Sequence, residues 1–211
     1  MQTFNPKNIF TSILDQNTPA ATARIQGDVD HANLYGIVSF YNTPFGGVLV
    51  NAEVYGLPGS GFFGMHIHEF GDCSQTPGNM MPLPSVVQPR TNMLPTGNMQ
   101  NSDNTQSSDN TQVLDNMQIM RNIRPPMSMQ AFPNTGNHYN PGNVPHPEHA
   151  GDLPPLLSNS GYAWMSFYTS RLNLEDIIGR SLVIHSMADD FTSQPSGNSG
   201  DKIGCGVIKS V

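Results

Sequence analysis

Six of the seven histidines in this 211-residue chain gather in three short stretches, and an imidazole can serve as a metal ligand. In chain order they are His66, His68, His138, His146, His149 and His185. On a β-strand, residues two apart project from the same face, so His66 and His68 can present two imidazoles to one ion. A strand histidine can equally be a hydrogen-bonded structural residue, so this pair alone does not define a site.

The second stretch combines histidines with a carboxylate. His138, His146 and His149 precede Asp152 within fifteen residues, on a segment rich in proline and glycine that shows no other reason to hold them. Three imidazoles and one carboxylate are a ligand set that suits tetrahedral Zn²⁺. The sequence therefore predicts a zinc site on a loop.

The composition indicates which elements must position these side chains. Hydrophobic residues make up 36% and charged residues 12% of the chain, which has 20 Gly, 18 Pro and 21 Asn. Charged residues make up about 25% of an ordinary globular protein. Such a composition disfavours long helices and favours short strands joined by turns. We therefore expect an antiparallel β-sandwich or barrel.

Several segments have the β-branched and aromatic residues of strands. They are residues 23–27, 34–41, 47–56, 61–68, 161–168, 181–185 and 205–209. Residues 42–47 are of turn type, so the strands on either side of them are expected to form an antiparallel hairpin.

Two segments stand apart from this β pattern. We expect residues 1–21 to be an N-terminal extension, in which a frayed terminus is favoured over a short helix with Ile9, Phe10, Ile13 and Leu14 on one face. Residues 78–135 carry eight of the twelve methionines and an Asn-containing six-residue repeat. This range is interpreted as a low-complexity insertion in a single β domain that spans 22–208. Its thioethers could bind Cu(I), or the repeat could have expanded with methionine merely tolerated.

The charge balance excludes one class of partner. Nine Lys and Arg stand against sixteen Asp and Glu, which gives a net charge of -7, and no basic cluster is present. We therefore expect no nucleic-acid binding. No run of about 18 apolar residues is present, and residues 1–16 lack the pattern of a signal peptide. As written, the sequence predicts a soluble, unprocessed, cytoplasmic chain without membrane contact.

Six short motifs, in this order, resemble the copper/zinc superoxide dismutase family. They are GMHIHEFGD at 64–72, NHYNP at 137–141, HAGDL at 149–153, IGRSLVIH at 178–185, GNSG at 197–200 and CGVI at 205–208. The resemblance covers residues 22–77 and 136–208. It implies a Greek-key β-sandwich and an enzyme that converts superoxide into oxygen and hydrogen peroxide by alternate reduction and oxidation of copper beside a structural zinc.

The resemblance also implies a role for each candidate residue. The copper ligands would be His66, His68, His138 and His185. The zinc ligands would be His138, His146, His149 and Asp152. His138 would bridge the two metals through its two ring nitrogens and take up a proton when the bridge opens on copper reduction. Asp189 would link a copper histidine to a zinc histidine by hydrogen bonds.

Cys73 and Cys205 stand where the family has its intrasubunit disulfide. The pair hints at an oxidising compartment, although this family can keep its disulfide inside cells, so an extracytoplasmic or surface location stays open. Family members occur as monomers and as dimers, which leaves a homodimer possible.

Three departures from the family pattern bear on function. Lys202 replaces the usual active-site arginine and lacks its planar fork of donors, so we expect a working but slower enzyme. The interval from His146 to His149 is short, and the insertion at 78–135 enters the loop that would carry zinc ligands.

Two alternatives stay open: a non-enzymatic copper or zinc binding protein with a copper-acquiring Met-rich loop, and a surface or coat component.

Overall fold

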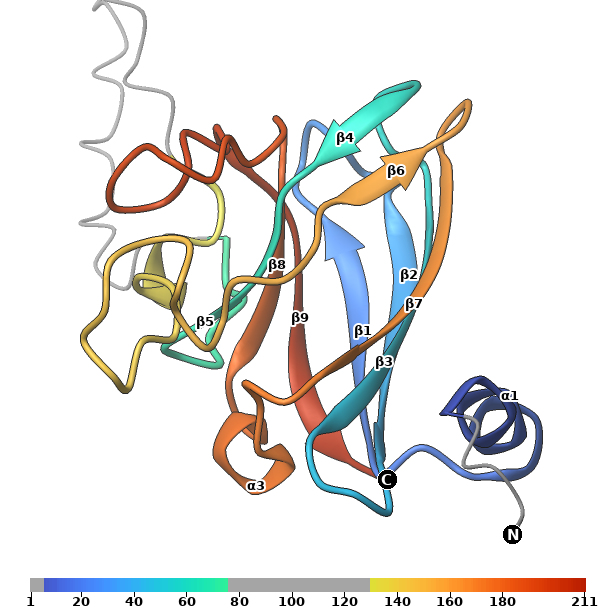
Figure 1. Ribbon diagram of the computed structural model, residues 1–211. Coiled ribbons are helices and arrows are strands. Elements are labelled where there is room, and N and C mark those ends of the chain that lie inside the picture. Colours follow the sequence, from blue (N-terminus) through green and yellow to red (C-terminus); the bar gives the residue numbers. More distant parts are fainter. Residues whose placement is uncertain (1–5, 76–129) are drawn as a thin grey trace, which may run out of the picture. The chain divides into compact units, whose positions relative to one another are not determined.

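The structure is a computed structural model that describes residues 6–75 and 130–211 (Figure 1). Most of the insertion expected at 78–135, including its repeat, lies outside the described residues. Within the described part of the chain, none of the helices has the length and apolar character needed to cross a bilayer.

Antiparallel strands dominate the described residues. They are β1 (Ala21–Gly27), β2 (Tyr35–Asn42), β3 (Val48–Tyr55), β4 (Gly61–Phe63), β5 (Met65–His68), β6 (Leu156–Ser158), β7 (Tyr162–Thr169), β8 (Ser181–His185) and β9 (Lys202–Ser210). A seven-stranded sheet has the order β5-β8-β9-β1-β2-β3-β7, and β4 pairs with β6 separately. The large sheet curls around the core (Figure 1). The antiparallel β fold predicted from the composition is confirmed.

The inward face of the sheet follows the two-residue period of a strand. Ala21, Ala23 and Ile25 of β1 are buried, and the residues between them are more exposed. The predicted hairpin is β2 and β3, which pair from Tyr35 with Tyr55 to Asn42 with Val48.

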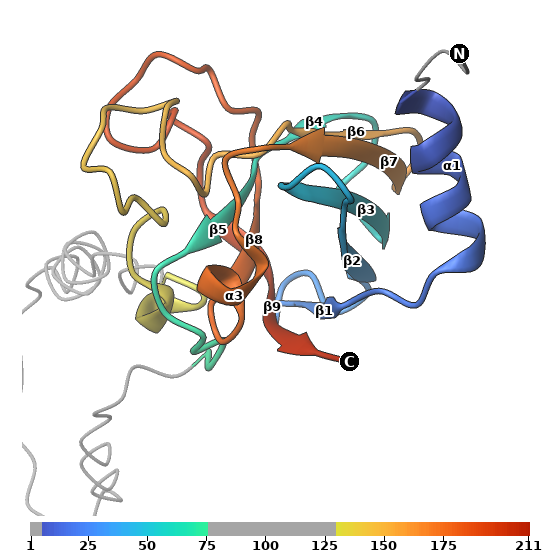
Figure 2. The same cartoon turned by 60° about the horizontal axis from the view of Figure 1, so that its bottom comes forward.

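Helix α1 (Pro6–Gln16) corrects the expectation of a frayed N-terminus. Ile13 is 7% exposed and packs with Tyr41 and Leu49, which face outward from the β2–β3 hairpin. The ring of Phe10 stacks on Tyr168 of β7 at 5.5 Å between centroids. The helix thus covers part of the outer face of the sheet (Figure 2).

The expected insertion at 78–135 extends too far at its C-terminal end. Residues 130–135 belong to the folded domain and include the 3-10 helix η1 (Pro133–Thr135). Phe132 is 2% exposed and packs with Val183 and Cys205, while Thr135 is fully buried. Strand β6 and the short helix α3 (Leu174–Ile177) had no counterpart in the sequence analysis.

Candidate metal centre

The histidines gather on the outer face of the sheet where β5 pairs with β8. Met65 and Ile67 point into the core, so the alternation of β5 places His66 and His68 on the opposite face. His185 ends β8 directly after the core residue Ile184. The loop that follows η1 brings His138 beside His68, with which it forms an isolated β-bridge.

Four histidines form the first cluster. Ligand atoms of His66, His68, His138 and His185 all lie within 4.8 Å of one another. All four side chains are buried, and the rings of His66 and His138 are 4.0 Å apart between centroids.

The outer ring nitrogens of these histidines are held by the protein. Nδ1 of His68 donates to the carbonyl of Gly136 at 3.0 Å, and Nδ1 of His185 donates to the carbonyl of Gly200 at 3.2 Å. Burial holds the pKa of His68 well below its usual value and lowers that of His185 to about 3. Both rings are therefore neutral at pH 7, and the single N–H of each is already used.

The inner nitrogens of the four rings carry lone pairs that could bind a cation. Nε2 of His68 lies 3.3 Å from Nε2 of His185, and in neutral rings both atoms carry lone pairs. Nδ1 of His66 and Nε2 of His138 are buried without a hydrogen-bond partner in the described part of the chain. Four inward lone pairs with no donor to receive them fit a metal ion with imidazole ligands.

The second cluster collects around Asp152. Its oxygens lie 2.8 Å from Nδ1 of His138, 3.0 Å from Nδ1 of His146 and 3.2 Å from Nδ1 of His149. The contact with His146 is short but is not a hydrogen bond, and Nδ1 of His146 has no hydrogen-bond partner among the described residues. Ligand atoms of the four residues lie within 4.8 Å of one another, which fits a tetrahedral zinc site.

His138 belongs to both clusters. Its Nδ1 faces Asp152, and its partnerless Nε2 belongs on the side of the four-histidine cluster. One imidazole can serve two ions in this way because its two ring nitrogens are separate donors.

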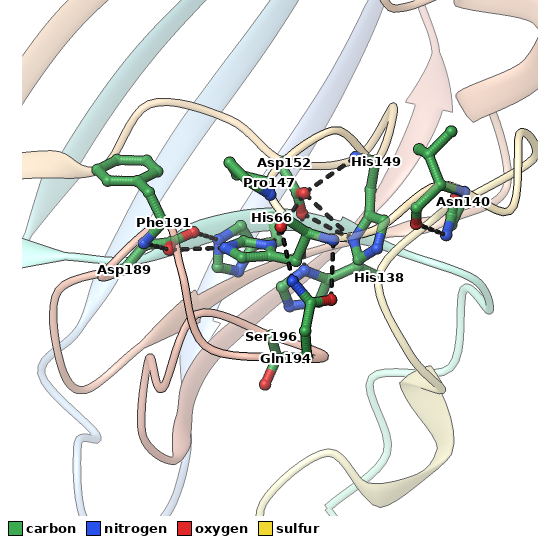
Figure 3. Close-up of polar contacts among 12 residues, drawn as sticks. His66, His138, Asn140, Pro147, His149, Asp152, Asp189, Phe191, Gln194 and Ser196 are labelled. Carbon is green, nitrogen blue, oxygen red and sulfur yellow. Dashed lines mark hydrogen bonds and ion pairs between the residues drawn. The ribbon is translucent and has the colours of Figure 1, made fainter.

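Asp189 links the two clusters by hydrogen bonds to one histidine of each (Figure 3). Its Oδ2 accepts from Nε2 of His66 at 2.8 Å, and its Oδ1 accepts from Nε2 of His146 at 2.9 Å and from the backbone N–H of Phe191 at 2.7 Å. Burial alone would raise the pKa of Asp189, but these hydrogen bonds outweigh it and lower the pKa to about 2. Gly197, with a φ of 66°, passes so close that a Cβ there would strike both Asp189 and His146.

A cavity of about 570 Å³ opens beside the first cluster, and His68, His138 and His185 contribute to its wall. Lys202 and Glu69 are the charged side chains that line it within the described residues, apart from the histidines. Lys202 is 7% exposed, and its Nζ donates to Oγ1 of Thr135 at 2.7 Å and to the carbonyl of Gly136 at 3.2 Å. The sequence analysis missed Thr135, whose only signal is its place three residues before His138.

The predicted disulfide and the seventh histidine, His31, lie outside the clusters. Cys73 and Cys205 form a disulfide, which ties the segment after β5 to β9. His31 lies apart from the clusters, and its Nδ1 is 2.7 Å from Asp28 in the turn after β1.

Comparison with known proteins gives a family match. The sequence profile of the copper/zinc superoxide dismutase (SODC) family matches residues 34–208. A superoxide dismutase [Cu-Zn] of Deinococcus radiodurans is 37% identical over 93 residues, and the match covers 38% of this chain and 51% of that protein. The chain thus spans about half the length of this relative.

Two other relatives match over more of the chain. A superoxide dismutase [Cu-Zn] of Legionella pneumophila is 29% identical over 177 residues, which cover 82% of this chain and 77% of that protein. The crystal structure of a double mutant of a SOD-like protein from Bacillus subtilis superposes with a TM-score of 0.56 at 22% identity, covering 90% of this chain and 97% of that one. At that identity the likeness supports the fold alone.

Proposed function

The chain belongs to the copper/zinc superoxide dismutase family, and from this premise we propose that it converts superoxide into oxygen and hydrogen peroxide. The observation that carries the proposal is the pair of clusters that share His138, each with the ligand types its metal prefers.

The proposal assigns a metal to each cluster. His66, His68, His138 and His185 would hold copper, and His138, His146, His149 and Asp152 would hold zinc. Bound copper would supply the one-electron chemistry, accepting an electron from one superoxide and returning it to a second. The zinc ligands fix the loop that carries His138, and Asp189 orients one histidine of each set.

The remaining steps belong to the side chains. The Lys202 ammonium attracts the superoxide anion into the cavity, where it is the one lysine or arginine side chain among the described residues of the lining. His138 would hold one proton at Nε2 and give it to the departing peroxide, and water would supply the second proton that hydrogen peroxide needs. Lys202 is a point charge that lacks the fork of an arginine, so we expect a rate constant below that of family members with arginine there.

Metal analysis combined with a superoxide assay tests this function. Wild type loaded with copper and zinc should accelerate superoxide decay, and His66→Ala should lose bound copper and most of that acceleration. A wild type that holds full copper but leaves superoxide decay unchanged would overturn the enzyme proposal and favour a metal-binding protein.

The superoxide assay does not address the rival copper-acquiring role or the oligomeric state. The rival copper-acquiring role depends on methionines that lie outside the described residues. A homodimer stays a prediction, and sedimentation equilibrium of the metal-loaded chain would give twice the monomer mass if it is right.

A further inference from the structure

We propose that Thr135 is a positioning residue that aims the Lys202 ammonium into the cavity beside the four-histidine cluster. This inference rests on the proposed function, since it concerns how that cavity receives an anion. The residues of the sequence motifs do not include Thr135, and the structure alone brings it to Lys202.

The directions of the hydrogen bonds around Thr135 are fixed. Its hydroxyl proton goes to the carbonyl of Phe132 at 3.0 Å, which leaves a lone pair of Oγ1 to accept from Nζ of Lys202 at 2.7 Å. An ammonium group has three N–H donors. Thr135 and the carbonyl of Gly136 accept two of them, so one N–H is left for a ligand in the cavity.

The acceptor itself is held rigidly. Thr135 is fully buried, and Phe132, to which it donates, packs against Val183 and against Cys205 of the disulfide. Because Cys205 lies three residues after Lys202 on β9, the disulfide anchors both partners of the hydrogen bond.

Lysine needs such an anchor more than arginine does. Its charge sits at the end of a flexible four-carbon stem, whereas the guanidinium fork is planar and rigid. Without the threonine hydroxyl, the carbonyl of Gly136 would be the one remaining acceptor within the described contacts of Nζ. The ammonium would keep its charge but lose its fixed direction, and a bound anion would lose a preorganised donor.

The test compares Thr135→Val with Thr135→Ser in the full, copper- and zinc-loaded chain. Azide serves as the anion probe, with its dissociation constant read from the copper absorption spectrum, alongside the superoxide rate constant. Valine keeps the branched shape but removes the acceptor, so we expect azide affinity and the rate constant to fall about 5- to 10-fold. Serine should restore both to near the wild-type values, and Thr22→Val on β1, outside the cavity lining, is the matched control.

A double-mutant cycle with Lys202→Gln separates positioning from a purely structural effect. If Thr135 acts through Lys202, Thr135→Val should cause no further loss of azide affinity in the Lys202→Gln background. Equal azide affinities of Thr135→Val and wild type, or an undiminished loss in that background, would overturn the inference. A protein that shows the coupled azide effect but does not consume superoxide would retain the inference and refute the proposed function.

Discussion

Asp189 contacts both histidine clusters without belonging to either group of candidate ligands. Each of its oxygens accepts from a different imidazole, and both bonds are buried. Because the bonds occupy Nε2 of His66 and of His146, they turn Nδ1 of each ring toward its cluster. A carboxylate has two oxygens and both accept, so each can serve a different imidazole.

Asp189→Asn should therefore weaken metal binding without removing a ligand. The amide has one accepting oxygen, so one of the two imidazoles would face an N–H group. We expect the affinity for zinc or copper to fall about 10- to 100-fold, measured by competition with a chelator. Asp190→Asn is the control, because the hydrogen bonds of Asp190 go to Thr192 and Ser193 and not to a histidine. Equal metal affinities of Asp189→Asn and wild type would contradict this role.

Protonation of two other buried histidines, His68 and His185, sets a pH dependence for the metal-free protein. Burial lowers the pKa of His185 to about 3 and holds that of His68 well below 6.5, whereas the unfolded chain binds protons at about 6.5. The stability linked to these groups is full above pH 6.5 and is lost as the pH falls toward 3. Each such histidine contributes a slope of about 1.4 kcal/mol per pH unit in that window. Denaturant midpoints that stay level from pH 7 to pH 5 would contradict this prediction, because they would show that the folded rings take up protons as readily as the unfolded chain does.

The sequence predicted the members of the clusters but not how Lys202 is held. The family resemblance, which rests on short local motifs, implied the roles of His66 and His138, and it implied that of Asp189 from its place four residues after His185. Thr135 and Lys202 are 67 positions apart, and the hydroxyl reaches the ammonium only through tertiary packing.

At the scale of elements, β5 separates the core from the candidate site. Its four residues are all buried, with Met65 and Ile67 in the core and His66 and His68 turned outward. The loops after η1 and after β8 close over this outer face, away from α1 (Figures 1 and 2). The core and the candidate metal ligands therefore lie on opposite faces of one strand.

Helix α1 stabilises the opposite side of the domain, and its apolar pattern was visible in the sequence. A frayed terminus was favoured because the first residues of a domain are often poorly ordered unless they are tied down. A helix of 11 residues such as α1 is marginal in water on its own. The stability of α1 depends on its contacts with Tyr41 and Leu49. The helical pattern alone could not predict that these two strand residues would contact the helix.

Ile13→Ala should lower the free energy of unfolding by about 2 kcal/mol, because it leaves a cavity under the helix. Metal content should stay at the wild-type level, since α1 lies away from the clusters. Ser12→Ala on the exposed side of α1 serves as the control, and its change should stay within about 0.5 kcal/mol. Loss of bound metal in Ile13→Ala would show that the helix and the site are coupled.

At the scale of the whole molecule, the disulfide and residues 130–135 mark where the insertion must rejoin the domain. Closing the loop between Cys73 and Cys205, 132 positions apart, stabilises the fold by about 5 kcal/mol in the chain-entropy model. Loop-closure entropy grows slowly with length, so a long insertion within that loop adds little cost. Phe132 and Thr135 are both buried, so the folded domain already includes residues before 135.

Two deletions test that boundary. Replacing residues 80–129 with a short Gly-Ser linker should leave metal content and thermal stability close to those of the full chain. A deletion that also removes 130–135 takes away the Phe132 contact with Cys205 and the acceptor for Lys202, and should lower the melting temperature and the superoxide rate constant. Equal melting temperatures and equal superoxide rate constants of the two variants would show that the insertion does not end at residue 129.

The dependence of superoxide decay on bound copper is the most direct test of the proposed superoxide dismutase activity. Zinc-loaded chain would be titrated with copper, and the first-order decay of a superoxide pulse would be followed at each measured occupancy. We expect a decay rate that rises in proportion to copper and stops rising at one copper per chain. A decay rate that stays at the uncatalysed value up to full occupancy would contradict it.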